Sequence, residues 1–322
     1  MNDRAQRRAS VYRSVAEIPP DWGPTVAAIG NFDGVHLGHQ EILQSVVAEA
    51  RACGARALAL TFDPHPEQFL RPSLAPRLLT PIAERLALLE ATGVDAVLVL
   101  PFDAALAGMR AQKFVAEVLI ERLHVIALHE GGNFRFGHRA EAGVEELAAF
   151  GSEFVFALHL HRAVRTHGME VSSSAVRALV ASGDVRRARW MLGRPFALCS
   201  TQVRGRGVGG RLLVPTVNLA PPSELLPAFG VYVSRLRLGT RCFEAVTNLG
   251  NRPTFKDAGF SIESHILDFE PTEADEDTPL QLEFLLRLRV EIEWPSPEAL
   301  RAQIFKDVAR AKRYFRRLGA PR

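Results

Sequence analysis

The first half of the chain alternates short apolar runs with longer stretches in which apolar residues recur at helical spacing. The apolar runs have the length of buried strands and span residues 26–29, 57–62, 94–100, 125–128 and 154–160. Helical spacing recurs between several of them, at residues 42–47, 82–93 and 114–123. Residues 1–23 are polar and show no clear pattern. Strands that alternate with helices predict an α/β doubly wound parallel sheet.

The pattern changes near Gly193-Arg194-Pro195, after which short alternating runs are separated by turn residues. This is typical of β structure. Ser296-Pro297 then begins a final helix that extends to about Leu318. The second half therefore predicts a small antiparallel β-barrel domain with a C-terminal helix. We place the domain boundary at residue 192, which gives domains 1–192 and 193–322.

The composition indicates the general class to which the protein belongs. The chain has 322 residues, 47% hydrophobic and 23% charged, enough for two domains that each bury a core. A net charge of +3 gives no support for nucleic-acid binding. The three cysteines are isolated, as in proteins of a reducing compartment. The basic N-terminus lacks an apolar segment after it, and no run reaches membrane-spanning length. We expect a cytoplasmic protein with no membrane contact.

The first predicted strand ends in a glycine-bounded loop that enters a helix at two histidines. Its loop residues are Gly30, Asn31, Phe32, Asp33 and Gly34. His36 and His39 lie three residues apart and share one helix face. Open α/β sheets bind ligands at their carboxyl edge, and a helix N-terminus favours anions. Two imidazoles there suit the charge of a triphosphate under attack at its α-phosphorus. A pair of surface histidines is the alternative interpretation.

Polar residues also follow the second and fourth predicted strands. Asp63 and His65 stand in a DPHP sequence at the end of the second strand, although a proline-rich turn with incidental polar residues remains an alternative. Asn133 stands in a glycine-rich loop after the fourth strand, where its amide can contact a nucleotide or its metal. We expect Phe134 and Phe136 to be core residues rather than stacking groups.

A serine-rich stretch follows the fifth predicted strand. Hydroxyls, free helix N–H groups and an arginine converge there in a way that suits a leaving pyrophosphate. The residues are Ser172, Ser173, Ser174 and Arg177. An ordinary serine-capped helix would have the same pattern, so the stretch alone is weak support.

The second half contains a GxGxxG sequence at Gly205, Gly207, Gly209 and Gly210. A dinucleotide fingerprint needs a helix next, but Pro215 follows closely, so we interpret the glycines as a loop over phosphates before Thr216 and Asn218.

A predicted strand further along, at residues 261–267, carries Glu263 and His265 on one face and Ile262 and Ile266 on the other. A lone glutamate on a strand is usually on a solvated face.

The sequence GNFDGVHLGHQ resembles the HxGH signature of nucleotidyltransferases and, in its wording, the bacterial bifunctional riboflavin kinase/FAD synthetases. The similarity extends over roughly residues 25 to 315 through further motifs: TFDPHP, Asn133, Ser172–Arg177, PTVN, NLGNRPTF and ESH. It implies that the C-terminal domain phosphorylates riboflavin with MgATP to give FMN. It also implies that the N-terminal domain adenylates FMN with ATP to give FAD and pyrophosphate.

The resemblance also implies roles for single residues. Asp63 and His65 lie beside the flavin, and Thr216 and Asn218 serve Mg²⁺ and the ATP phosphates. Glu263 is the base for the riboflavin 5′-hydroxyl. The sequence departs from the family at the glycine loop, where Leu213-Val214 replace the usual Gly-Phe and one arginine is missing. The substrates implied are riboflavin, FMN and ATP, and the oligomeric state is left open.

Two other functions remain as alternatives. A nucleotidyltransferase for another phosphate ester, such as a pantetheine phosphate or nicotinate mononucleotide, shares HxGH but lacks the PTVN and ESH matches. A C-terminal domain that binds flavin without kinase activity is the second, and the altered glycine loop is its only support. Nucleic-acid binding has only the arginine-rich ends in its favour.

Overall fold

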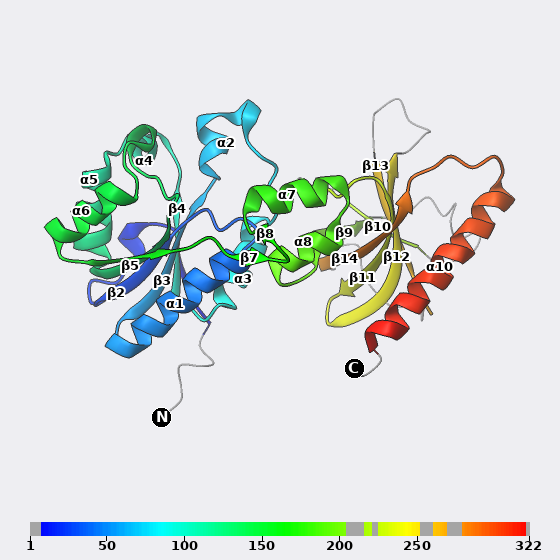
Figure 1. Ribbon diagram of the computed structural model, residues 1–322, viewed down its shortest axis with the longest axis horizontal. Coiled ribbons are helices and arrows are strands. Elements are labelled where there is room, and N and C mark those ends of the chain that lie inside the picture. Colours follow the sequence, from blue (N-terminus) through cyan, green and yellow to red (C-terminus); the bar gives the residue numbers. More distant parts are fainter. Residues whose placement is uncertain (1–7, 204–215, 221–224, 252–259, 269–278, 320–322) are drawn as a thin grey trace. The chain divides into compact units, whose positions relative to one another are not determined.

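The computed structural model describes residues 8–203, 216–220, 225–251, 260–268 and 279–319 (Figure 1). The chain divides into two compact units, Met1–Ser172 and Ser173–Arg322. The first is an α/β unit and the second contains a β-barrel, so the predicted fold classes are confirmed. In the part of the chain that is described, no helix is long and apolar enough to cross a membrane.

The first unit contains a parallel sheet in the strand order β1-β4-β3-β2-β5-β6. Its strands are β1 Ser10–Tyr12, β2 Thr25–Ile29, β3 Arg56–Asp63, β4 Ala96–Pro101, β5 Val125–Gly131 and β6 Ala157–His161. A two-stranded hairpin follows, formed by β7 Arg165–Thr166 and β8 Met169–Glu170.

Several details of the sheet differ from the sequence-based expectation. Strand β4 begins at Ala96 rather than at 94, and β5 extends to Gly131 rather than to 128. Strand β1 lies in the segment without a pattern, where three residues at a sheet edge are too few for a recognisable period. Strand β6 begins at Ala157 rather than at 154, because a helix continues to Phe154 and Val155 then takes a left-handed conformation, with φ of 60°.

Helices cover both faces of the sheet (Figure 1). They are α1 Leu37–Cys53, α2 Pro66–Leu70, α3 Ile82–Glu90, α4 Ala104–Ala107, α5 Ala111–Lys113 with the π-helix Phe114–Arg122, and α6 Val144–Phe154. Short 3₁₀ helices add Val15–Glu17, Pro72–Leu74 and His138–Ala140.

Alternate strand residues enter two separate cores. Val26 and Ala28 pack in one with α1 and α3, whereas Ala27 and Ile29 pack in the other with the π-helix and α6. The apolar runs of β2, β3 and β4 are therefore buried on both faces, as expected for a parallel sheet, whereas the edge strand β6 is largely exposed.

The second unit begins with α7 Ser173–Ser182 and α8 Val185–Leu192 and continues into a closed barrel in the order β10-β13-β12-β11-β14-β9. The barrel strands are β9 Phe196–Val203, β10 Thr216–Leu219, β11 Gly230–Leu238, β12 Arg241–Asn251, β13 Phe260–Ile266 and β14 Pro279–Val290. Neighbouring strands are antiparallel, as predicted. The contacts group α7 and α8 with the barrel, and the boundary at residue 192 stays a prediction.

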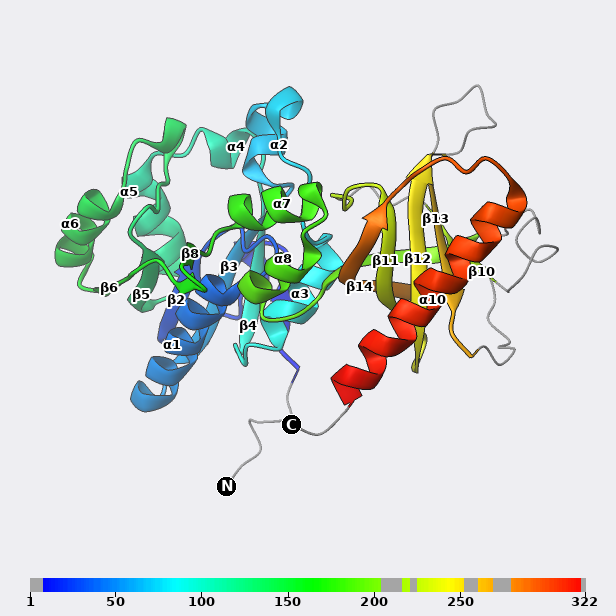
Figure 2. The ribbon, with the colours of Figure 1, turned by 45° about the vertical axis from the view of Figure 1, so that its right-hand side comes forward.

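The C-terminal helix α10 Pro297–Gly319 lies across β11 and β12 (Figure 2). Ala311 and Phe315 of α10 pack on the outer face of the barrel with Val233. An ion pair at 2.8 Å between Arg289 of β14 and the buried Asp307 of α10 fixes the helix further. Inside the barrel, the hydroxyls of Ser234, Thr247 and Ser264 are joined by hydrogen bonds of 2.6 and 2.8 Å, which link β11, β12 and β13.

Candidate functional site

The loop after β2 has an unusual backbone. Three of its residues have positive φ: Phe32 at 47°, Gly34 at 83° and Val35 at 37°. Phe32 and Val35 are also almost fully buried. Non-glycine residues hold this conformation only where the surrounding structure enforces it, and such strain is concentrated at functional sites. The lack of a side chain at Gly30 leaves room for this loop conformation, because a Cβ there would lie 3.2 Å from the Phe32 ring.

The carboxylate of Asp33 fixes this loop to the segment before α3. It accepts hydrogen bonds from the backbone N–H groups of Leu79 and Thr80 at 2.9 to 3.0 Å. The Thr80 hydroxyl in turn accepts the N–H of Gly34 at 3.1 Å. Asp33 is 1% exposed, so these contacts give it a role in holding the loop. Its predicted contact with nucleotide phosphates stays a prediction.

His36 and His39 stack on each other at the start of α1, with ring centroids 3.6 Å apart and planes at 17°. His36 Nδ1 accepts the backbone N–H of His39 at 3.3 Å and so caps the helix. In a neutral ring, an accepting Nδ1 leaves the proton on Nε2. His36 is therefore held as an N–H donor at a helix N-terminus, which is the predicted arrangement for anion binding.

Gly38 provides the space for this arrangement. A Cβ at position 38 would lie 3.2 Å from Cε1 and 3.3 Å from Nδ1 of His36, closer than an ordinary van der Waals contact. The glycine of HxGH is thus explained by the packing of the first histidine.

Arg85 of α3 was not among the residues selected from the sequence. Its side chain is fully buried, and Nη1 donates to the carbonyl oxygens of Asn31 at 3.0 Å and Phe62 at 3.2 Å. Burial lowers the pKa of Arg85, and the charges of Asp33 and Asp63 oppose this shift. The guanidinium therefore joins the ends of β2 and β3 beneath the HxGH loop.

We expect Arg85→Met to impair FMN adenylylation and loosen both strand ends, because two buried carbonyl oxygens lose their donor. Each unsatisfied buried group costs about 1–3 kcal/mol. Hydrogen–deuterium exchange should become faster in peptides that cover Asn31 and Phe62, while activity of the barrel unit persists. Unchanged exchange in both peptides would contradict this role.

Asp63 and His65 lie where β3 ends and α2 begins. His65 is 5% exposed, its Nδ1 accepts the N–H of Glu67 at 3.2 Å, and its own N–H donates to Gln68 at 3.2 Å. These bonds cap α2, so the imidazole has at least a structural role. The predicted position of both residues beside the flavin stays a prediction.

The glycine-rich loop after β5 leaves Asn133 exposed, with its Oδ1 above Gly131. Its contact with a nucleotide or metal stays a prediction. Phe134 and Phe136 are partly buried. Their rings lie against each other with centroids 5.4 Å apart and pack against one of the two cores, which agrees in part with their prediction as core residues.

Glu130 was also not among the residues selected from the sequence. Its side chain is a buried carboxyl group next to the loop after β2. It is 3% exposed, and its Oε1 accepts the N–H of Ile29 at 2.7 Å. Burial raises the pKa of Glu130 well above its ordinary value, and the hydrogen bond from Ile29, which favours the carboxylate, offsets only part of the rise.

This raised pKa predicts a pH-dependent stability. The contribution of protonated Glu130 to the stability of the native state is fully present below the ordinary pKa of 4.5. That stability is lost as the pH rises towards the native pKa, because the unfolded chain ionises more readily. Glu130→Gln keeps the acceptor but cannot ionise. We expect the Tm of the wild type, relative to this variant, to fall as pH rises from about 4 to 8. Tm is measured by circular dichroism at each pH. Parallel curves of Tm against pH for the wild type and Glu130→Gln would contradict the prediction.

The predicted pyrophosphate residues fall at the division of the chain. Ser172 ends the first unit, whereas α7 of the second contains the other three, Ser173, Ser174 and Arg177. Their joint role stays a prediction.

The barrel brings two of the predicted kinase residues into one row. Asn218 of β10 and Glu263 of β13 are direct partners, and Asn248 of β12 is the partner of Glu263 on its other side. Directly opposite residues share a face and have Cβ atoms about 4.5–5.5 Å apart. Ser264 and Thr247 are fully buried on the opposite face, so the predicted orientation of Glu263 is confirmed.

Asn218 is only 8% exposed and Glu263 is half-buried, which indicates a partly covered polar site. Asn248 completes the row but was not selected, because sequence spacing does not reveal strand register. Thr216 pairs with His265 through the backbone. The side chain of Thr216 and the glycines Gly205, Gly207 and Gly209 lie outside the described residues, so their predicted phosphate and metal contacts stay predictions.

Comparison with known proteins agrees with both units. The FAD synthetase family matches residues 18–175, and the riboflavin kinase family matches residues 192–315. The bifunctional riboflavin kinase/FMN adenylyltransferase of Haemophilus influenzae is 32% identical over 89% of this chain and 93% of its own. The Escherichia coli K12 protein of the same name is 34% identical, with 90% and 92% covered. That of Pseudomonas fluorescens is 34% identical, with 94% and 96% covered.

A crystal structure titled as a macrolide-efflux protein from Streptococcus pneumoniae has the same fold, with a TM-score of 0.85, 25% identity, and 95% of this chain and 99% of that chain covered. The family matches and the curated relatives together span nearly the whole chain and include both units. The chain belongs to the bifunctional riboflavin kinase/FMN adenylyltransferase family.

Proposed function

We propose that this chain makes FAD from riboflavin in two steps. The second unit transfers the γ-phosphoryl group of ATP to the 5′-hydroxyl of riboflavin, which gives FMN and ADP. The first unit then joins FMN to a second ATP: an FMN phosphate oxygen attacks the α-phosphorus, and pyrophosphate leaves. The observation that carries the proposal is the family match along both units.

In the first unit, the chain's contribution is positioning and charge stabilisation. The Nε2–H of His36 and the backbone N–H groups at the start of α1 are the donors that we assign to the triphosphate of ATP. His39, stacked on His36, is the second donor that we assign to the same charge. Asp33 and Arg85 act through the loop, since their contacts are with its backbone and its neighbours.

In the second unit, we assign Glu263 as the base that accepts the proton of the riboflavin hydroxyl. Asn218 lies directly across from it, so substrate and phosphate contacts can be held on neighbouring strands. The amide oxygen of Asn218 is a hard donor of the kind that Mg²⁺ takes, and Thr216 is the second residue that we assign to the metal and phosphates. When bound with ATP, Mg²⁺ neutralises charge on the transferred phosphoryl group.

A time course with the full chain tests the proposal. The protein is incubated with riboflavin, ATP and magnesium, and the flavins are separated by chromatography. We expect FMN first and FAD afterwards. Conversion of supplied FMN to FAD while riboflavin stays unchanged would instead mean that the second unit binds flavin without phosphorylating it.

A further inference from the structure

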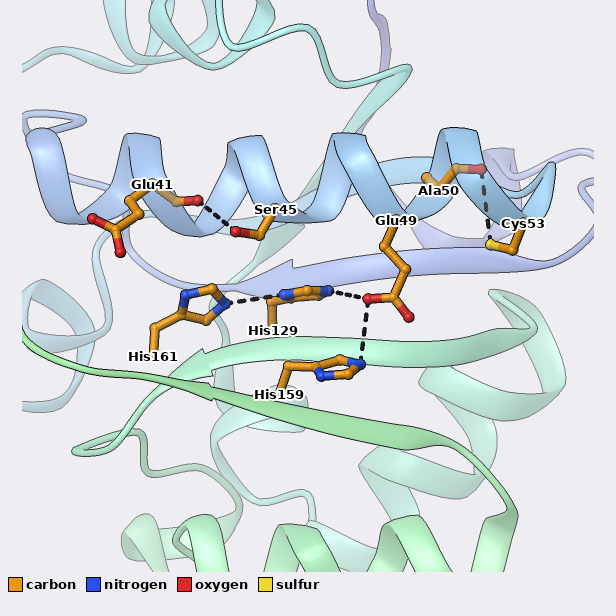
Figure 3. Close-up of polar contacts among 8 residues, drawn as sticks. All are labelled: Glu41, Ser45, Glu49, Ala50, Cys53, His129, His159 and His161. Atoms are coloured by element: carbon orange, nitrogen blue, oxygen red, sulfur yellow. Dashed lines mark hydrogen bonds and ion pairs between the residues drawn. The ribbon is translucent and has the colours of Figure 1, made fainter.

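A cluster of one glutamate and three histidines lies between α1 and the adjoining strands of the first unit (Figure 3). Glu49 comes from α1, His129 from β5, and His159 and His161 from β6. The Glu49 carboxylate oxygen lies 2.6 Å from His129 Nε2 and 3.3 Å from His159 Nε2. The cluster is built from segments that are far apart in the sequence, and neither proposed reaction uses it.

The donor atoms of Glu49, His129 and His159 all lie within 4.8 Å of one another. Tetrahedral zinc, with ligand bonds of about 2.0–2.1 Å, holds neighbouring donors about 3.3 Å apart. The His159–Glu49 separation already has this value, and the His129–Glu49 contact needs to open by less than 1 Å. We propose that Glu49, His129 and His159 form a binding site for a divalent transition metal such as Zn²⁺.

His161 has the position of an outer partner. Its Nε2 lies within hydrogen-bond distance of Nδ1 of His129, at 3.0 Å, while Nε2 of His129 faces Glu49. Metal-binding histidines regularly donate their other ring N–H to a partner, which fixes the ring and its tautomer.

The exposure of the three side chains allows entry of an ion and leaves room for water. His129 is 6% exposed, whereas Glu49 is 34% and His159 is 47% exposed. The buried histidine gives a fixed anchor, and the other two ligands close the site from the surface. Three protein ligands with water in the fourth position is a common arrangement for zinc.

This site is distinct from the nucleotide site that we propose at the start of α1. Glu49 follows His36 by thirteen positions along α1, which corresponds to about 20 Å of helix. Two imidazoles and one carboxylate favour zinc, nickel or cobalt over magnesium, which prefers oxygen donors alone. A bound ion would join the C-terminal half of α1 to β5 and β6. Helix α1 is also the helix that begins at the HxGH histidines.

Direct titration of the metal tests the site. The full chain, stripped with chelator and free of nucleotide, is titrated with Zn²⁺ by calorimetry. We expect one ion per chain with a Kd in the low micromolar range or below, and a rise in Tm with excess Zn²⁺. His159→Ala and Glu49→Gln should each weaken binding at least a hundredfold, and His161→Ala about ten- to a hundredfold, the range for outer partners. His159 is half-exposed, so its loss should leave the fold intact.

Two matched controls test whether a histidine or a thiol outside the cluster binds the zinc. His124→Asn changes an exposed histidine outside the cluster whose φ of 47° asparagine also accepts. Cys53→Ser removes the exposed thiol at the end of α1. Both variants should bind Zn²⁺ as the wild type does, and the Co²⁺ form should show tetrahedral absorption without thiolate bands. The proposal would be overturned if the wild type did not bind Zn²⁺, or if His159→Ala and Glu49→Gln bound Zn²⁺ as tightly as the wild type does.

Discussion

His36→Asn should lower FMN adenylylation by about a hundredfold or more and leave riboflavin phosphorylation almost unchanged. Removing one preorganised donor that faces developing charge costs about 10²–10³ in turnover. Asparagine is a good N-cap, so it replaces the helix-capping role of Nδ1 but not the Nε2–H donor. The measurement is the initial rate of FAD formation from supplied FMN and ATP.

A second variant at the same position separates catalysis from folding. His36→Ala removes the cap as well, which costs about 1 kcal/mol of stability. Both variants should lose adenylylation equally, and only alanine should lower the Tm. An asparagine variant that keeps most of its adenylylation would show that His36 acts through the helix cap alone.

Glu263→Gln should lower riboflavin phosphorylation by about 10²–10⁴-fold, the usual contribution of a general base. Glutamine keeps the shape and one hydrogen bond but cannot accept the hydroxyl proton. Glu263 is held by strand pairing on both sides, to Asn218 and Asn248, so its position should not change. The measurement is turnover of riboflavin to FMN at saturating ATP, with riboflavin binding measured separately.

Glu244→Gln is the matched control for this change. Glu244 is exposed on β12 of the same barrel and is outside the proposed site. It should keep full kinase turnover, and both variants should keep FMN adenylylation. Near-normal turnover in Glu263→Gln would rule out Glu263 as the base and leave positioning by Thr216 and Asn218 to explain the reaction.

Strand and helix positions could be predicted because the core is regular. Apolar runs such as Val26–Ile29 are buried on both faces of a parallel sheet, and this burial is a local property of the sequence. The HxGH stretch was recognisable for a similar reason, since the histidines, the glycine and the helix start are contiguous. The exposed edge strand β1 has no such pattern and was missed.

The supporting residues could not be found in this way because their roles depend on long-range contacts. Arg85 reaches Asn31 from a position 54 residues later, and Glu130 reaches Ile29 from 101 residues later. Strand register, which aligns Asn248 with Glu263, is set by the whole barrel. The Glu49–His129 contact likewise spans 80 residues, and no spacing rule for metal ligands covers it.

Mixing two variants tests most directly the central claim that one chain holds two separate active sites. His36→Asn supplied with riboflavin and MgATP should stop at FMN, and Glu263→Gln should leave riboflavin unchanged yet convert supplied FMN to FAD. Together in one vessel, the two proteins should convert riboflavin to FAD, because FMN released by one is the substrate of the other. If either variant alone still made FAD from riboflavin at the wild-type rate, or if the mixture made none, the assignment of the two sites would be contradicted.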